Sequence, residues 1–392
     1  MKRIYLDHTA TTPLDPRVFE SMKPFFSDTF GNASSIHSFG RQARTALEHA
    51  RDLIANAIGA RPREVFFTSG GTESDNFAIQ GAARAAATRG RNHIVVPATE
   101  HHAVLEPCGH LAGEGFQVTF LPVDENGAVR PEDLQHAVTP STGVVSVMHA
   151  NNEVGTINPV REAAAIAHGA GAVFHTDAVQ TLGKIPLNVE DLGVDLLSVS
   201  AHKIYGPKGI GALYIRTGIT IDQLFYGGGQ ERGRRPGTEN VAMAVGFAKA
   251  VEIAAAEMES ESCRLRSLRD RLEAEIRAMF PSVIVNGDPA RRLPHILNIS
   301  FDHRSAPMEG DMLVVNMDLK GVAVTSGSAC TSGSMQPSHV LRAMGRDAQT
   351  AKATLRFSLG RGNSEEDVSS ALQALKEVVE MMNPSARAPA AP

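Results

Sequence analysis

The sequence is poor in the residues that stabilise disulfide-bonded or zinc-bound domains. Its 392 residues include no tryptophan and only three cysteines, Cys108, Cys263 and Cys330. These cysteines show no Cys-x-x-Cys spacing, which argues against a structural zinc site and against a disulfide framework. We therefore expect no bound metal and no disulfide.

Long apolar runs and an excess of one charge are also missing. Residues 1–10 lack the apolar stretch of a secretory signal, and the most apolar runs, such as 82–87, are short. The net charge is only −5, and the arginine cluster at 232–235 is short and broken by glycine. With 42% hydrophobic residues, the chain is expected to be a soluble cytoplasmic protein that binds neither membranes nor nucleic acid.

Nucleotide-binding motifs are absent as well. No Gly-x-x-x-x-Gly-Lys-Ser/Thr sequence occurs, and Gly183-Lys184 is followed by isoleucine. The glycine-rich segments 206–209 and 227–229 do not fit a dinucleotide fingerprint. The sequence therefore argues against a nucleotide as the ligand.

The periodicity of the first two thirds of the chain predicts an α/β fold. Strand-like runs alternate with helix-like segments such as 43–58, 74–87 and 162–169, which indicates a large, mostly parallel sheet sandwiched by helices. The seven strand-like runs lie near Val65, Ile94, Val118, Val144, Val173, Leu196 and Ala212.

The last third of the chain predicts a second, smaller α+β domain. It opens with a long helix pattern over 241–279 and continues with short strand-like runs. These runs are 283–285, 296–300, 322–324 and 354–357. The Ala/Pro-rich end, 383–392, cannot build a core and is expected to be a disordered tail.

Asp177 and Lys203 are the first pair of residues that point to a cofactor. Each follows an apolar, β-branched run that predicts a buried parallel strand, and strand ends are where open α/β sheets bind ligands. Pyridoxal phosphate needs a lysine that reaches its aldehyde and a carboxylate that pairs with its ring nitrogen. Taken singly, each residue could be an ordinary solvated charge.

A phosphate-binding turn is predicted over 68–74, between a strand and a helix. Its Thr-Ser-Gly-Gly-Thr-Glu-Ser sequence offers backbone N–H groups and hydroxyls at a helix N-terminus, with Gly71 and Thr72 at the centre. On its own the segment could equally be a glycine turn in which Thr72 caps the helix.

Five further motifs make the chain resemble a cysteine desulfurase of the NifS/IscS type. The resemblance runs in order from about residue 4 to about residue 375. The motifs are YLDHTATTP at 5–13, EHHAVL at 100–105, NNEVG at 151–155, SAHKIYGPKG at 200–209 and SGSACTS at 326–332. The resemblance implies a pyridoxal phosphate enzyme of fold type I. It also implies a seven-stranded large domain over 15–258 and a small domain formed by 1–14 and 259–382.

The resemblance also implies roles for individual residues. Lys203 resembles the lysine that bonds the cofactor aldehyde, Asp177 the partner of the ring nitrogen, and Gln180 the donor to the ring hydroxyl. His101 resembles the imidazole that stacks on the ring and helps to move protons. The matches to phosphate contacts are Gly71, Thr72, Ser200, His202 and, from the second subunit of a homodimer, Thr238.

Asn152 and Arg356 match groups that hold the carboxylate of the substrate. An arginine fork suits a carboxylate because its planar donors pair with both oxygens. Arg356 also lies in an apolar strand-like run, where an unpaired guanidinium would be costly, so an anionic partner is expected. A structural ion pair is the alternative for Arg356, and a simple turn is the alternative for Asn152.

Cys330 decides which reaction the resemblance predicts. It lies in a Ser/Gly/Thr-rich segment, 326–334, which is typical of a mobile loop with an accessible thiol, whereas Cys108 and Cys263 are expected to be inert. The predicted reaction removes sulfur from L-cysteine, leaves a persulfide on Cys330 and releases L-alanine. The persulfide would pass to an acceptor protein such as an iron–sulfur scaffold.

Two other readings remain open from the sequence. One is a selenocysteine lyase or another class-V aminotransferase-type enzyme, which would release no sulfide from cysteine or would not need Cys330. The other is a non-catalytic sulfur-delivery or scaffold protein, whose mark would be a lost lysine or cysteine. Three residues depart from the family pattern without removing a catalytic group: Gly71, where alanine is frequent, His8 and Pro236.

Overall fold

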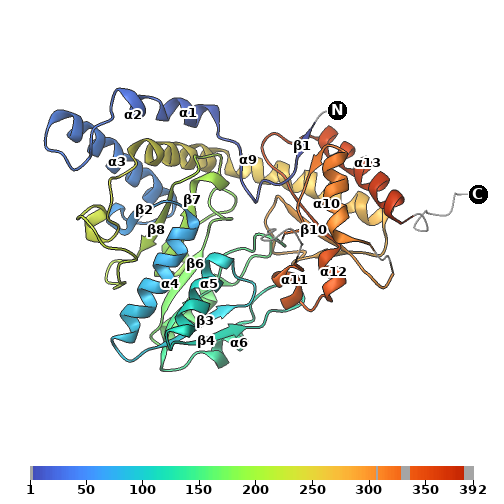
Figure 1. The fold of residues 1–392 in the computed structure, drawn as a ribbon, viewed down its shortest axis with the longest axis horizontal. Coiled ribbons are helices and arrows are strands. Elements are labelled where there is room, and N and C mark those ends of the chain that lie inside the picture. The colour runs from blue at the N-terminus through green and yellow to red at the C-terminus, as the bar shows by residue number, and fades with distance from the viewer. Residues whose placement is uncertain (1–2, 306–307, 328–335, 384–392) are drawn as a thin grey trace, which may run out of the picture.

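The computed structural model describes residues 3–305, 308–327 and 336–383. Figure 1 shows two groups of elements, one around a large sheet and one around β10, α10 and α13, with the long helix α9 (Val241–Met279) reaching from the first to the second. The first and last described elements, β1 and α13, both lie in the smaller group.

The large sheet has seven strands, as predicted, in the order β2-β8-β7-β6-β5-β3-β4. Only β8 runs against its neighbours, so the mostly parallel sheet is confirmed. The strands are β2 (Val65–Thr68), β3 (His93–Pro97), β4 (Gln117–Leu121), β5 (Thr142–Ser146), β6 (Val173–Asp177), β7 (Leu196–Ser200) and β8 (Gly211–Ile215).

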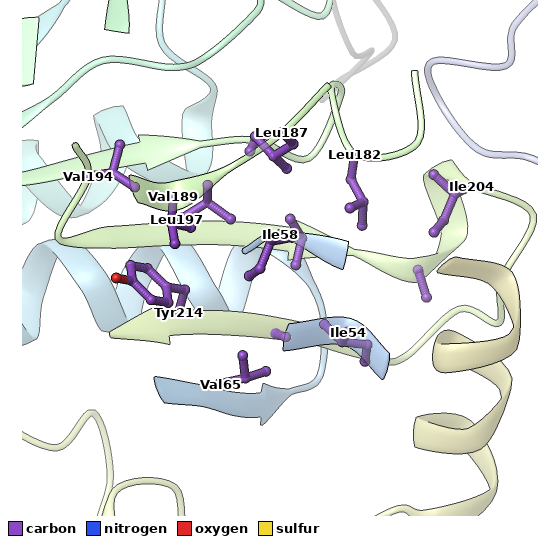
Figure 2. Packing of buried hydrophobic residues seen from close by; sticks show 14 of the residues in the cluster. Ile54, Ile58, Val65, Leu182, Leu187, Val189, Val194, Leu197, Ile204 and Tyr214 are labelled. Atoms are coloured by element: carbon purple, nitrogen blue, oxygen red, sulfur yellow. The ribbon is translucent and has the colours of Figure 1, made fainter. Parts of the chain in front are cut away.

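Apart from the edge strand β4, the strands are largely buried on both faces, because helices cover both faces of the sheet. In β2, Phe66 packs into one buried cluster with α4 and α5, while Val65 and Phe67 pack into a second cluster with α3 and α9. Figure 2 shows residues of this second cluster, among them Ile54, Ile58, Leu197 and Tyr214. Burial on both faces explains why these strands read as continuous apolar runs.

The helices of the first group lie between and before the strands in the chain. The α-helices are α1 (Pro16–Met22), α2 (Pro24–Ser27), α3 (Ser38–Ala57), α4 (Gly71–Ala87), α5 (His102–Gly113), α6 (Pro131–Ala137), α7 (Val160–Gly169) and α8 (Val189–Leu192). Three 3₁₀ turns are η1 (Pro62–Glu64), η2 (Ala201–Lys203) and η3 (Glu231–Gly233).

The smaller group has its own strands and its own apolar core. β9 (Val283–Asn286), β10 (Ile296–Phe301) and β12 (Thr354–Ser358) form an antiparallel sheet, and β1 (Ile4–Tyr5) pairs in parallel with β11 (Val322–Ala323). Its helices are α10 (Gly310–Leu319), α11 (His339–Ala343), α12 (Ala348–Lys352) and α13 (Glu365–Met382). Ile4 and Leu6 belong to this core, so the N-terminus packs with residues more than 250 positions away.

Helix α9 contributes to both cores. Its N-terminal part, including Phe247 and Val251, belongs to the core beside the large sheet, whereas Leu265 to Ile276 belong to the smaller core. The predicted domain boundary at residue 258 falls inside this helix. The boundaries of the two domains stay a prediction.

Among the residues that the structure describes, no helix is long and apolar enough to cross a membrane. In the same part of the chain, no group of three or more His, Cys, Asp or Glu side chains is arranged to hold a metal ion.

Candidate active site

A cavity of about 390 Å³ opens at the carboxyl edge of the large sheet. The carboxyl ends of β2, β6 and β7 meet there because these strands run in the same direction. Ten of the predicted site residues line it: Gly71, Thr72, His101, Asn152, Asp177, Gln180, Ser200, His202, Lys203 and Arg356. Thr238 does not line it, and Cys330 lies outside the described residues.

Lys203 ends η2, directly after β7, and its amine is held by the backbone of the N-terminal segment. Nζ donates to the carbonyl oxygens of Thr9 at 2.5 Å and Ala10 at 2.8 Å. Burial, reinforced by the positive charge of Arg356, lowers the pKa of Lys203 to about 8. About a tenth of the amine is therefore neutral, and able to react, at pH 7.

Asp177 is the last residue of β6 and lies buried at the cavity wall. Its Oδ1 accepts the N–H of Val179 at 2.8 Å, which fixes the orientation of the carboxyl group. Burial raises its pKa, whereas nearby His101 and Lys203 lower it. A cationic ring nitrogen placed here would favour the ionised carboxylate in the same way.

The turn before α4 has the shape of an anion cup. Gly70 caps the helix with φ 154°, which residues with a side chain rarely adopt, and a Cβ on Gly71 would come within 2.9 Å of Val179. The first N–H groups of α4 have no partner inside the helix. The buried Ser200 hydroxyl has no hydrogen-bond partner among the described residues, so the cup presents unused donors.

Three more predicted residues are oriented by contacts at the cavity. Nδ1 of His101 accepts the N–H of Ala103 at 3.1 Å, which leaves Nε2 as the nitrogen that can act on a ligand. Gln180 donates to the Thr9 carbonyl at 3.1 Å, and Nδ1 of His202 lies 3.1 Å from the Thr11 hydroxyl. Burial, with Lys203 nearby, lowers the pKa of His202 to about 4, so this imidazole is neutral.

Arg356, in β12, reaches the cavity from the smaller group of elements. Nη1 donates to the carbonyl oxygen of Asn152 at 2.9 Å, and Nη2 pairs with Asp7 at 2.8 Å. The structural ion pair considered for this residue therefore exists. The buried Nε has no hydrogen-bond partner within the described part of the chain, which leaves a donor for an anion.

Two buried acids beside Asp177, one of them in the cavity wall, were missed from the sequence. Asp75, in α4, and Glu100 are almost fully buried near Asp177, and burial holds the pKa of both well above the usual value. Asp75 lies 3.6 Å from His175, whose pKa burial lowers to about 3. A polar residue in a helix normally indicates an exposed face, so only the three-dimensional contacts identify Asp75 as part of the wall.

Backbone groups at the cavity were missed as well. Thr9, Ala10, Thr325 and Gly327 line it, and the first two hold Lys203 through carbonyl oxygens. The YLDHTATTP motif signalled this segment, although the side chains of the motif gave no reason to expect a backbone role.

The remaining predictions fall outside the cavity. Thr238 is exposed between η3 and α9. The arginines before it have partners within the chain: Arg235 pairs with Glu73 at 2.8 Å, and Arg234 stacks over Phe66. Cys108 is buried, which raises its pKa to about 12, in agreement with an inert role.

The donors in the cavity fit pyridoxal phosphate. The unused Ser200 hydroxyl and the N-terminus of α4 suit the phosphate, Asp177 suits the ring nitrogen, and the Lys203 amine suits the aldehyde. The fold and the site together therefore define a pyridoxal phosphate enzyme of fold type I.

Comparison with known proteins gives the family. Residues 4–370 match the family described as Aminotransferase class-V, and the chain belongs to that family. It is 52% identical over 383 residues to the cysteine desulfurase IscS of Dictyoglomus turgidum, covering 97% of this chain and 96% of that protein. It is 47% identical over 371 residues to the human cysteine desulfurase, covering 94% of this chain and 80% of that protein.

Solved structures agree with the sequence relatives. A NifS-like protein superposes with a TM-score of 0.90 at 39% identity, covering 97% of this chain and all of that one. The structure of SspA in complex with cysteine superposes with a TM-score of 0.80 at 36% identity, covering 91% of this chain and 98% of that one. The predicted resemblance to cysteine desulfurases of the NifS/IscS type is confirmed.

Proposed function

We propose that the protein is a cysteine desulfurase that moves the sulfur of L-cysteine to Cys330 and releases L-alanine. The main support for this proposal is the set of residues that line one cavity. Lys203 and Arg356 line the cavity together with Thr325 and Gly327, and Cys330 follows Gly327 by three residues in the sequence. A reactive amine, a carboxylate-binding donor and the approach to a thiol thus share one site.

The residues of the chain divide the work of binding. When bound, pyridoxal phosphate supplies an aldehyde that captures an amine and a ring that draws electrons from the Cα atom of the captured amino acid. The α4 turn and Ser200 hold the phosphate, while Asp177 holds the ring. The free Nε of Arg356, assisted by Asn152, grips the carboxylate of cysteine and orients its sulfur.

Proton transfer falls to Lys203 and His101. With a pKa near 8, the Lys203 amine can take a proton from Cα at neutral pH and return it later. His101 uses Nε2, because its Nδ1 is occupied by the N–H of Ala103. Both residues line the same cavity, so a proton can reach either carbon of the substrate.

The sulfur step needs no outside oxidant. The Cys330 thiolate attacks the sulfur of the substrate, an S–S bond forms, and the Cβ–S bond breaks. The electron pair left on Cβ takes up a proton, so cysteine and a thiol give alanine and a persulfide. The outer sulfur of the persulfide is then transferred to an acceptor protein in the cytoplasm, for iron–sulfur cluster assembly or for thiolation. The S–S bond breaks in this step, and Cys330 returns to the thiol.

The active form is a homodimer. Thr238 is exposed and lies away from the cavity of its own chain, so its phosphate contact would be made in the site of a second copy. Exposed apolar side chains at residues 26–39 offer a surface for that copy, with Phe30 65% and Ile36 90% exposed.

The test is the release of alanine and sulfide from L-cysteine by cofactor-loaded protein with excess thiol reductant. Cys330→Ala is expected to lower alanine release by at least about a hundredfold, because the nucleophile is lost. Cys263→Ala, at an exposed cysteine in α9, is the matched control and should retain full activity.

Two other outcomes would indicate a different enzyme. Full activity of Cys330→Ala would indicate a reaction that needs no thiol, as in a transaminase. Alanine formed from selenocysteine but not from cysteine by the wild-type protein would indicate a selenocysteine lyase.

A further inference from the structure

Glu153 is a buried acid that has no role in the binding and catalysis described above. It is 3% exposed and lies in the turn 151–155 that follows β5. The Asn151 side chain fixes this turn, because its Oδ1 accepts the N–H of Glu153 at 2.8 Å and that of Val154 at 3.0 Å. A carboxylate in such a rigid, buried place is costly unless it meets donors.

One oxygen of Glu153 meets the chain on both sides of residues 328–335. The Ser338 hydroxyl donates to Oε2 at 2.5 Å, and Ser338 caps α11 by accepting the N–H of Leu341 at 3.2 Å. On the other side, a Cβ placed on Gly327 would lie 2.6 Å from the same oxygen. The Gly327 backbone, with φ 93°, therefore packs directly against the carboxylate.

The same turn is joined to the group that grips the substrate. The carbonyl oxygen of Asn152 accepts Nη1 of Arg356, and the backbone of Arg356 pairs with that of Thr325. A second contact holds the start of α11, since Nε2 of His339 lies 3.0 Å from the Glu100 carbonyl oxygen. The turn 151–155 thus contacts the chain before the cysteine segment, the chain after it, and the substrate arginine.

We propose that Glu153 is a positioning residue that fixes Gly327 and Ser338 relative to the substrate site, so that Cys330 is delivered to the sulfur of bound cysteine. This inference rests on the proposed desulfurase function. Glu153 acts through the backbone of Gly327 and the hydroxyl of Ser338, and it binds neither substrate nor cofactor itself.

The first test measures the hydrogen exchange of the two segments that flank residues 328–335, and it needs no catalytic reaction. Hydrogen exchange of cofactor-loaded protein is followed in peptides that cover 321–327 and 338–345. Glu153→Ala is expected to speed exchange in both windows, because both ends lose their shared contact. Ser338→Ala should speed exchange only in the second window, and Glu125→Gln, at an exposed acid, should change neither.

The second test separates binding from sulfur transfer. In Glu153→Gln and Ser338→Ala, the rate of persulfide formation on Cys330 in a single turnover is expected to fall about tenfold, in line with the loss of a hydrogen bond to a charged group. The affinity for L-cysteine, followed by the absorbance of the cofactor, should stay within about twofold of wild type. Thermal unfolding checks that each variant is folded.

The outcomes are distinct. The role of Glu153 would be overturned if Glu153→Ala changed hydrogen exchange in only one of the two windows. It would also be overturned if Glu153→Gln formed the persulfide at the wild-type rate. An equal loss of cysteine affinity would also overturn it, since the turn would then act on the substrate. If the wild-type protein itself forms no persulfide, the proposed function fails, and the exchange experiment still decides whether Glu153 joins the two ends.

Discussion

At the scale of single residues, Lys203 shows how burial prepares a side chain for chemistry. Its amine is enclosed by two carbonyl oxygens and faces the positive charge of Arg356, and its pKa falls to about 8. Carbonyl oxygens can accept hydrogen bonds from the charged or the neutral amine, whereas burial and Arg356 favour the neutral one. The site therefore holds Lys203 in place while it promotes loss of the proton.

This environment predicts the pH dependence of cofactor capture. Lys203 reacts as the neutral amine, so the rate at which cofactor-free protein binds pyridoxal phosphate should rise with pH to a midpoint near 8. Arg356→Gln removes a charge that lowers this pKa, so its midpoint should move to higher pH. Arg130→Gln, at an exposed arginine, serves as the control, and an unmoved midpoint in Arg356→Gln would contradict the explanation.

The same shift has a defined effect on stability. An unfolded lysine keeps its ordinary pKa of 10.5, so between pH 8 and 10.5 the unfolded chain binds more protons at this position than the folded one. The contribution of Lys203 to the free energy of unfolding therefore rises with pH across that window.

At the scale of elements, the first turn of α4 links the phosphate cup to the β6 edge. Gly71 packs against Val179, two residues after Asp177, so the cup and the ring partner are held by one contact. The space that a methyl group at position 71 would need is taken by Val179.

This contact predicts a compensating pair of substitutions. Gly71→Ala would force a shift, because its Cβ would lie 2.9 Å from Val179, and the dissociation constant for pyridoxal phosphate is expected to rise about tenfold. Adding Val179→Ala should restore binding. Gly109→Ala, in α5 with nothing within 4 Å, is the control and should stabilise the protein by about 0.5–1 kcal/mol without an effect on the cofactor.

The elements were predicted well where periodicity decides, and poorly where distant segments meet. The seven strands of the large sheet lie where apolar β-branched runs were found, and in all but the edge strand β4 the signal is strong because both faces are largely buried. The pairing of β1 with β11 could not be derived, since a two-residue strand carries no periodicity and its partner is more than 300 residues away. Glu153 and Asp75 escaped for the related reason that burial of an acid depends on partners from other elements.

At the scale of the whole molecule, an exposed apolar surface at 26–39 supports the proposed dimer. Phe26, Phe30 and Ile36 are 58%, 65% and 90% exposed, and this region belongs to the end of the molecule away from α13. A surface of this kind is unfavourable in water unless a partner covers it.

The dimer predicts a change in mass on substitution of this surface. Phe30→Lys combined with Ile36→Lys should convert the protein to monomers in light scattering, and the monomer should bind pyridoxal phosphate more weakly because it lacks Thr238 of a second copy. Leu319→Lys, at a side chain that is 74% exposed on α10, should leave the mass unchanged. Monomeric wild-type protein with full cofactor affinity would contradict the dimer.

The N-terminal segment that holds Lys203 also sets the order of events during synthesis. Asp7 contacts Arg356, and Thr9 donates its N–H to the Ser358 hydroxyl, in each case across 349 positions of sequence. The ribosome makes these residues about 350 positions before their partners. The nascent chain can thus fold much of its large sheet, but it cannot complete a competent site until residues 356–358 have emerged. A truncated product would carry Lys203 without its finished surroundings.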